Sequence, residues 1–155
     1  MKYNIIYADP PWWFNDQKKV RKDGKTPTKG IGACHHYECM KIEKLAPLMA
    51  DKLYNLATDN CAFFCWWLGT HHMDLAEIIK QANQRYRYKK DMWRVVRSDA
   101  FVWVKMVKDG SHPTMGPGHY TRICCEQCAL LMRGSLPVLD HTILQTVMEP
   151  RRQHS

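Results

Sequence analysis

The chain has 155 residues, of which 45% are hydrophobic and 25% charged. It is long enough for one hydrophobic core, so we expect a single domain over residues 1–155, and no apolar run reaches the roughly 18 residues of a membrane span. The formal charge of +8 favours a polyanionic partner, because lysines and arginines that neutralise phosphates release condensed counterions. The amino terminus offers no signal-peptide cleavage site, so we expect a cytoplasmic protein whose seven cysteines are reduced.

Apolar strands and helices alternate along the chain. A short apolar run predicts a strand over 4–8, and a long polar loop follows it to about residue 36. Helical spacing predicts helices over 42–53 and 72–84, with Pro47 as a break or restart. Further apolar runs predict strands over 61–68, 92–96, 101–106, 129–132 and 143–147. This alternation predicts an α/β fold with a mainly parallel sheet, helices on both faces, and a functional site at the carboxyl ends of the strands.

The motif Asp9-Pro10-Pro11-Trp12 follows the first predicted strand, where an open α/β sheet places its reactive groups. The N6 amine of adenine is a poor nucleophile, because its lone pair is delocalised into the ring. A carboxylate and a carbonyl held by rigid prolines can accept both amine hydrogens and stabilise the positive charge that develops during methyl transfer. Trp12 can stack on a base that has left its helix. The alternative is a structural Asp-Pro turn with buried aromatic rings, and the motif alone leaves both possibilities open.

Basic residues gather in two stretches. The first lies in the long polar loop and supplies candidate phosphate contacts at Lys18, Lys19, Arg21 and Lys22. The second spans 85–97 and interleaves cations with Tyr86, Tyr88 and Trp93. This composition is typical of a surface that binds phosphates and stacks bases, although simple solvation is the alternative.

A zinc site is a further alternative for one short segment. Cys34, His36 and Cys39 are thiol and imidazole side chains close together in the chain, and such groups can share a zinc ion. The spacing departs from paired C-x2-C knuckles and has no second half, so we expect no metal.

Six segments, in this order and spacing, carry a wider resemblance: NIIYADPPWWF, HHYECMKIEKL, CAFFCWWLG, AFVWVKMVKDG, GHYTRICCEQCALLMRG and TVMEPRRQHS. They resemble the adenine-N6 methyltransferase family, which includes phage and bacterial DNA adenine methylases and the catalytic subunit of the eukaryotic messenger-RNA adenine methyltransferase. The resemblance implies a Rossmann-like methyltransferase fold with permuted motif order. It also implies S-adenosylmethionine as cofactor and methyl transfer to the N6 amine of adenine in nucleic acid, with DNA favoured over RNA.

The resemblance implies roles for individual residues. Asp9 and Pro10 would hold the target amine, Asp9 would also meet the methionine amine of the cofactor, Pro11 would rigidify the turn, and Trp12 would stack on adenine. The substrate-binding candidates are a gate-loop tyrosine, a strand-end lysine, an acidic residue and a Glu-x-Arg element, in chain order Tyr37, Lys105, Glu126, Glu149 and Arg151. Each role has a structural alternative. Tyr37 could be a loop aromatic packed on the core, Lys105 an ordinary lysine at a strand end, and Glu149 and Arg151 a structural ion pair.

The sequence also departs from the family. There, the EPRR-type segment is followed by a Lys-Pro-Asp-Glu helix, a strand reading ELFGR or ELFAR, and a Gly-Asn segment, which hold the methionine carboxylate and the ribose. None of these occurs before Ser155. The sequence therefore predicts that the chain by itself binds S-adenosylmethionine weakly or not at all and methylates nothing measurable. The alternative function is a catalytically incomplete nucleic-acid-binding remnant or subunit.

Overall fold

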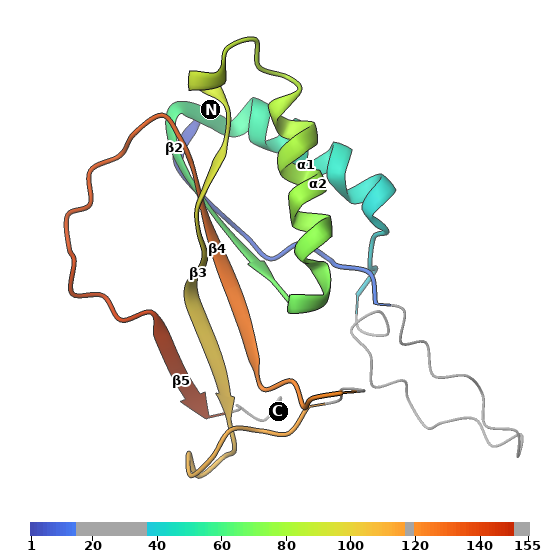
Figure 1. The fold of residues 1–155 in the computed structure, drawn as a ribbon, viewed down its shortest axis with the longest axis vertical. Coiled ribbons are helices and arrows are strands. Elements are labelled where there is room, and N and C mark those ends of the chain that lie inside the picture. Colours follow the sequence, from blue (N-terminus) through green and yellow to red (C-terminus); the bar gives the residue numbers. More distant parts are fainter. Residues whose placement is uncertain (15–36, 117–119, 151–155) are drawn as a thin grey trace, which may run out of the picture.

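The computed structural model describes residues 1–14, 37–116 and 120–150. Over these ranges the chain forms a five-stranded sheet and two α-helices (Figure 1). The elements, in chain order, are β1 (Tyr3–Ala8), α1 (Ile42–Leu56), β2 (Ala57–Trp67), α2 (His72–Asn83), β3 (Arg94–Met106), β4 (Cys125–Arg133) and β5 (Thr146–Pro150). Neither α-helix of this part combines the length and the apolar character that a membrane-spanning helix needs.

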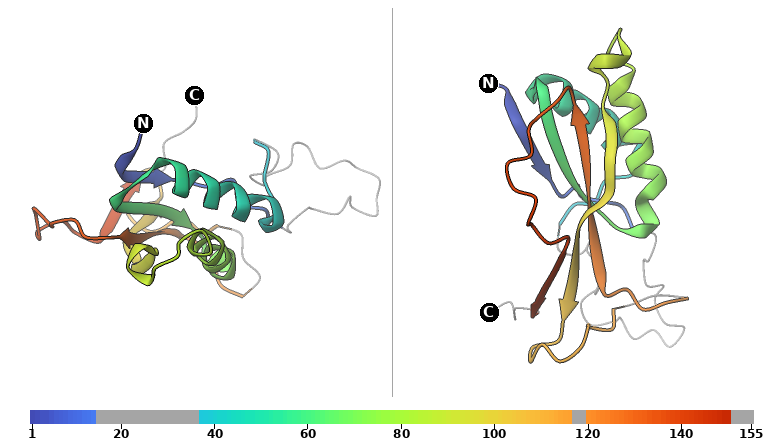
Figure 2. Two further views of the ribbon diagram at one scale, coloured as in Figure 1. Left: turned by 90° about the horizontal axis from the view of Figure 1, so that it is seen from above. Right: turned by 60° about the vertical axis from the view of Figure 1, so that its left-hand side comes forward.

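The strand order in the sheet is β1-β2-β4-β3-β5. β1 pairs in parallel with β2, and β3 pairs in parallel with β5, whereas β4 is antiparallel to both of its neighbours. Four strands therefore point the same way and β4 alone points back, as Figure 2 shows. The reversal follows from the order of the strands: β3 and β4 succeed each other in the chain and are neighbours in the sheet, and no helix lies between them among the described residues. The predicted α/β class with a mainly parallel strand direction is confirmed.

Both α-helices cover the same face of the sheet. Fully buried residues of α1, among them Leu45 and Leu53, join Ile78 of α2 in one core cluster with Phe63 of β2 and Leu131 of β4. The helices also pack directly against each other, and Figure 1 labels them next to each other. One apolar core therefore holds the two helices and the inner sheet face together.

The prediction of helices on both faces differs from this arrangement of the described residues. On the outer face of β1, Ile5 and Tyr7 are 60% and 66% exposed. The reason is topological: the crossovers from β1 to β2 and from β2 to β3 advance in the same direction across the sheet, and right-handed crossovers that keep one direction place their helices on one face.

The predicted elements are largely found, with some changes. Helix α2 agrees with the prediction to within one residue, whereas α1 runs through Pro47 without a break. A proline this near the helix start removes one intrahelical hydrogen bond, and the full burial of Leu45 and Ala50 on either side holds the helix together. Strand β5 begins at Thr146 instead of residue 143.

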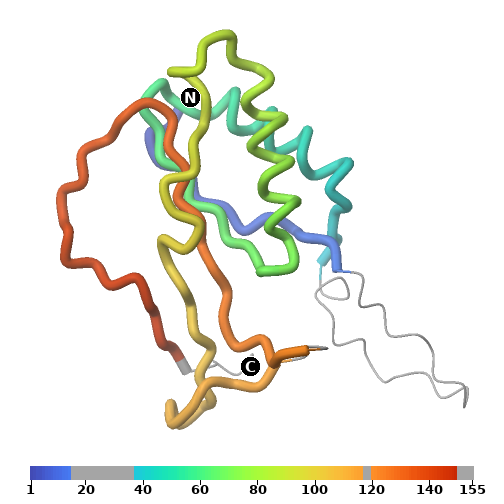
Figure 3. Tube along the Cα trace, in the orientation of Figure 1, coloured from blue at the N-terminus to red at the C-terminus, as the bar shows by residue number. Residues whose placement is uncertain are grey.

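One long strand replaces the two strands predicted over 92–96 and 101–106. The pairing of β3 with β4 shifts register between Val95 and Arg97 and again between Arg97 and Phe101. The polar Arg97-Ser98-Asp99 stretch interrupts the apolar pattern, and for this reason the sequence predicted two strands where the structure has one. Figure 3 traces this irregular strand along the length of the sheet.

Gly134 ends β4 and gives a test of the local fold. Its φ of +64° lies in the left-handed region, and an added Cβ would lie 2.2 Å from Asn60 Oδ1 and 2.3 Å from the Asp59 carbonyl oxygen. We expect Gly134→Ala to lower the free energy of unfolding by about 1–3 kcal/mol, measured by urea denaturation. The matched control is Gly69→Ala, because a Cβ there meets nothing within 4 Å. Equal losses in the two variants would contradict this reading of Gly134.

Candidate active site

The Asp-Pro-Pro-Trp motif lies immediately beyond β1, at the carboxyl end of the parallel β1–β2 pair. The pairing ends at Ala8 opposite Cys65, and the motif begins at the next residue. The Met40 backbone N–H donates to the Pro11 carbonyl at 2.8 Å, and Trp12 and Met40 form an isolated parallel bridge. These contacts hold the segment that precedes α1 against the motif, so that Tyr37 is brought to the same end of the sheet.

Four of the predicted site residues form one electrostatic cluster. Asp9 interacts with Glu126 and Lys105, Tyr37 interacts with Asp9 and Glu126, and Lys105 forms an ion pair with Glu126. The register of β3 and β4 places Glu126 opposite Trp103, so that Lys105, two residues further along β3, lies on the same face of the sheet. Lys105 also lies over the Trp103 ring, 5.0 Å from its centroid. The fold therefore brings these four residues together.

The cluster changes the acidity of its members. Partial desolvation raises the pKa of Asp9 above the usual 3.8, the Glu126 carboxylate raises it further, and Lys105 opposes them. Partial desolvation also raises the pKa of Tyr37, and the negative charges of Asp9 and Glu126 add to this effect. Asp9 is therefore a better proton acceptor than an ordinary surface aspartate, provided that it remains ionised.

The backbone of the motif leaves one acceptor position open. Pro10 is buried, and its carbonyl oxygen accepts the Trp12 backbone N–H at 2.8 Å. A carbonyl oxygen has two lone pairs, so one remains for a second donor. The Asp9 carboxylate and this carbonyl are adjacent in the chain, which gives the site two acceptors for the two hydrogens of an amine.

The structure gives Trp12 a different position from the one predicted. Its side chain is only 4% exposed, and the indole Nε1–H donates to the Trp66 carbonyl oxygen at 3.0 Å. The ring stacks on His71 with centroids 5.2 Å apart and planes 15° apart. Because the ring is already stacked and covered, we correct the base-stacking role predicted for Trp12: it anchors the motif to the core.

His71 is a structural partner of the motif that the sequence reasoning missed. The residue is 5% exposed, its Nδ1 lies 2.8 Å from the Asp74 carboxylate, and Phe14 packs edge-on against its ring at 5.0 Å. It therefore joins the motif to the first turn of α2. The i, i+3 spacing of His71 and Asp74 was the only signal of this in the sequence, and by itself it is not specific.

The remaining candidates divide between described and undescribed residues. Glu149 of β5 is exposed and is the register partner of Lys105, so it lies at the same end of the sheet. The other predicted phosphate contacts and candidate ligands lie outside the described residues: Lys18, Lys19, Arg21, Lys22, Cys34, His36 and Arg151.

Cys39 is disulfide-bonded, so the prediction that every cysteine is reduced is wrong at this position. The zinc alternative needs its thiolate, which a disulfide removes. Among the described residues, no three potential metal ligands lie together.

Comparisons with known proteins agree with the motif resemblance. No family model matches the chain. In sequence it is 26% identical over 164 residues to the type II methyltransferase M.MunI of Mycoplasma sp., an alignment that covers 99% of the chain and 62% of that protein. In structure it is similar to the protein of the M1.HpyAVI–SAM complex, with a TM-score of 0.53 and 12% identity, over 97% of the chain and 57% of that protein. The chain thus spans less than two thirds of either protein.

The fold and the position of the motif define a class of protein. A mainly parallel sheet, a carboxylate-proline turn at the carboxyl end of β1 and the similarity in fold together identify a Rossmann-like methyltransferase fold, as predicted. The similarity to M.MunI, a type II methyltransferase, along nearly all of the chain agrees with the resemblance seen in the sequence motifs.

The burial of Trp12 leads to a test that needs no substrate. We expect Trp12→Ala to lower the free energy of unfolding by about 3–5 kcal/mol, because a buried ring with a hydrogen bond is lost. Trp12→Phe keeps an aromatic ring on His71 but loses the indole N–H, so it should cost less than Trp12→Ala. Urea denaturation without nucleic acid measures both. Unchanged stability of Trp12→Ala would show that the ring faces solvent, as base stacking requires.

Proposed function

We propose that this chain is the catalytic part of an S-adenosylmethionine-dependent methyltransferase that modifies the N6 amine of adenine in DNA. The observation that carries the proposal is the pair of adjacent acceptors, the Asp9 carboxylate and the Pro10 carbonyl, at the end of β1. An exocyclic amine has two hydrogens and no charge, and two fixed acceptors match it. The similarity to M.MunI supports methyl transfer as the reaction.

The residues of the motif act on the amine. Asp9 and the Pro10 carbonyl accept its hydrogens, draw electron density onto the nitrogen and so make it more nucleophilic. S-adenosylmethionine, when bound, supplies a methyl group on a positively charged sulfur. This methyl group would pass to the amine nitrogen, and the sulfur would keep the electron pair of the broken C–S bond. Asp9, with its raised pKa, takes the proton that the methylated nitrogen must lose.

The chemistry of the cluster suits both the cofactor and the base. The Asp9 carboxylate complements the positive sulfonium and the methionine ammonium of S-adenosylmethionine. Tyr37 is 52% exposed beside Asp9, so its ring is available to stack on the target base. The Lys105–Glu126 ion pair fixes the charges that face Asp9. We propose that Glu149 and Arg151 complete the base-binding edge.

We further propose that DNA is the partner and that the protein acts in the cytoplasm. Lys18, Lys19, Arg21 and Lys22 are the proposed phosphate contacts, and the net charge of +8 supports a polyanionic partner. The second candidate function is a nucleic-acid-binding subunit without its own activity. Calorimetric titration of the chain, extended by the carboxyl-terminal segment of M.MunI, with S-adenosylmethionine separates the two, since only the enzyme needs measurable cofactor binding.

We expect Asp9→Ala to lower the turnover of methyl transfer by about a hundredfold to a thousandfold, because a preorganised acceptor is lost from the reacting amine. Incorporation of labelled methyl groups into DNA measures this. The assay uses the chain and a version extended by the carboxyl-terminal segment of the M.MunI relative. Glu43→Ala is the control, because Glu43 is an exposed acidic residue in the first turn of α1. Full activity of Asp9→Ala in a protein whose control is also active contradicts the assignment.

The pH dependence of turnover gives a second test. As the pH falls through the raised pKa of Asp9, the carboxylate is protonated and activity is lost. Glu126→Gln removes a charge that raises this pKa, so the acid limb of the pH–rate profile should move to lower pH. Lys105→Met removes a charge that lowers it, so the limb should move to higher pH. Shifts in the same direction, or no shift in either variant, would mean that Asp9 does not control this limb.

A further inference from the structure

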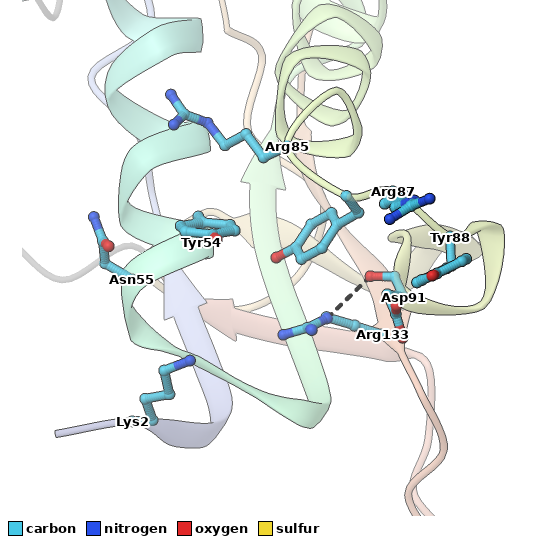
Figure 4. Close-up of a pocket in the computed structure, with 9 residues that line it drawn as sticks. Lys2, Tyr54, Asn55, Arg85, Arg87, Tyr88, Asp91 and Arg133 are labelled. Atoms are coloured by element: carbon cyan, nitrogen blue, oxygen red, sulfur yellow. Dashed lines mark hydrogen bonds between the residues drawn. The ribbon is translucent and has the colours of Figure 1, made fainter.

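A basic pocket of about 270 Å³ lies at the opposite end of the sheet from Asp9. Its walls come from the start of β1, the end of α1, the loop after α2 and the end of β4. The lining side chains include four cations and two exposed tyrosines (Figure 4), which are Lys2, Arg85, Arg87, Arg133, Tyr54 and Tyr88. Asp91 is the one carboxylate among the lining residues. The pocket therefore favours an anionic ligand with a planar group.

Arg133 builds the floor of the pocket. It is 7% exposed, and its guanidinium donates to the Asp91 carbonyl at 3.0 Å, the Thr58 carbonyl at 3.2 Å and the Asp59 carboxylate at 3.0 Å. It also stacks over the Tyr86 ring at 4.5 Å. These contacts tie the loop after α2 to both β2 and β4, so the wall that carries Arg87 and Tyr88 is held in place.

The other cations remain available to a ligand. Arg85 is paired with Asp51 at 2.6 Å, at the surface, where a second anion can replace or share the contact. In the described part of the chain, Lys2 and Arg87 form no ion pair. Arg87 and Lys90 both lie near the Tyr88 ring, 5.4 and 5.8 Å from its centroid. An exposed tyrosine with cations beside it is suited to stack on a base while the cations contact phosphates.

We propose that this pocket binds the phosphate backbone of the same DNA whose adenine reaches Asp9. The choice of DNA rests on the proposed function, whereas the affinity for nucleoside phosphates follows from the pocket itself. Lys2 and Asp9 lie seven residues apart along β1, which corresponds to about 23 Å. Stacked base pairs advance about 3.4 Å each, so the pocket lies about seven base pairs from the target base. DNA that extends this far on one side contacts both sites.

The test is the dependence of binding on duplex length. Fluorescence anisotropy compares duplexes that extend about 4 and about 12 base pairs beyond the target adenine. We expect the longer duplex to bind several-fold more tightly, and Arg87→Ala and Lys2→Ala each to remove most of this gain and to reduce the slope of log K against log [salt] by about one. The matched control is Lys80→Ala, because Lys80 is an exposed cation of α2 that pairs with Glu77.

The outcomes separate the possible sources of the ligand and the two proposals. Equal affinity of Arg87→Ala and Lys80→Ala for the longer duplex overturns the inference. A mononucleotide that displaces the longer duplex from the pocket at equal phosphate concentration also overturns it, since the ligand would then be a free nucleotide.

Methyl transfer is measured in parallel: Arg87→Ala should raise KM for the longer duplex and leave kcat unchanged. If the version extended by the carboxyl-terminal segment of M.MunI retains the length dependence but methylates no DNA, the proposed function is contradicted and the pocket assignment stands.

Discussion

The stacking of Trp12 on His71 is the contact on which the candidate site depends. It joins the turn beyond β1 to the start of α2, and the indole hydrogen bond to Trp66 joins the same turn to β2. With the ring anchored, Asp9 and Pro10, which precede it by three and two residues, are held at the end of the sheet. A site that aligns two acceptors with one amine needs this rigidity, because a misalignment of about 1 Å can cost a hundredfold in rate. The aromatic residue of the motif thus serves orientation, and Tyr37 is left as the exposed ring beside Asp9.

The second requirement is electrostatic. Asp9 must be ionised to accept hydrogens, yet basic enough to take a proton when the amine becomes positive. The structure combines a neighbouring carboxylate, Glu126, that raises the pKa of Asp9 with a neighbouring ammonium, Lys105, that lowers it. Because β1 and β3 point the same way, the ends of both strands reach the same edge of the sheet, and β4 starts there. The sheet topology therefore brings these charges together from distant parts of the sequence.

Local patterns predicted the strands, the helices and the position of the motif after β1, because each depends on residues close in the chain. Side-chain burial was not predictable in this way: Trp12 looked like a base-stacking residue, and only the three-dimensional position of His71 shows why it is covered. The prediction placed helices on both faces of the sheet, whereas both α-helices of the described residues lie on one. The order of the elements along the chain does not show in which direction the crossovers advance across the sheet, and this direction decides the face. The basic stretch over 85–97 was predicted to contact nucleic acid, but its place at the far end of the sheet was not predicted. That place depends on Arg133, which donates to the Asp91 carbonyl and lies 36 or more residues later in the chain.

The central claim is that Asp9 and Pro10 hold the N6 amine of adenine. The most direct measurement is mass spectrometry of the nucleosides from DNA that has been incubated with S-adenosylmethionine and the chain extended by its relative's carboxyl-terminal segment. N6-methyladenine that disappears in the Asp9→Ala variant is the predicted result. A methyl group on cytosine, or N6-methyladenine formed equally by Asp9→Ala, would contradict the claim.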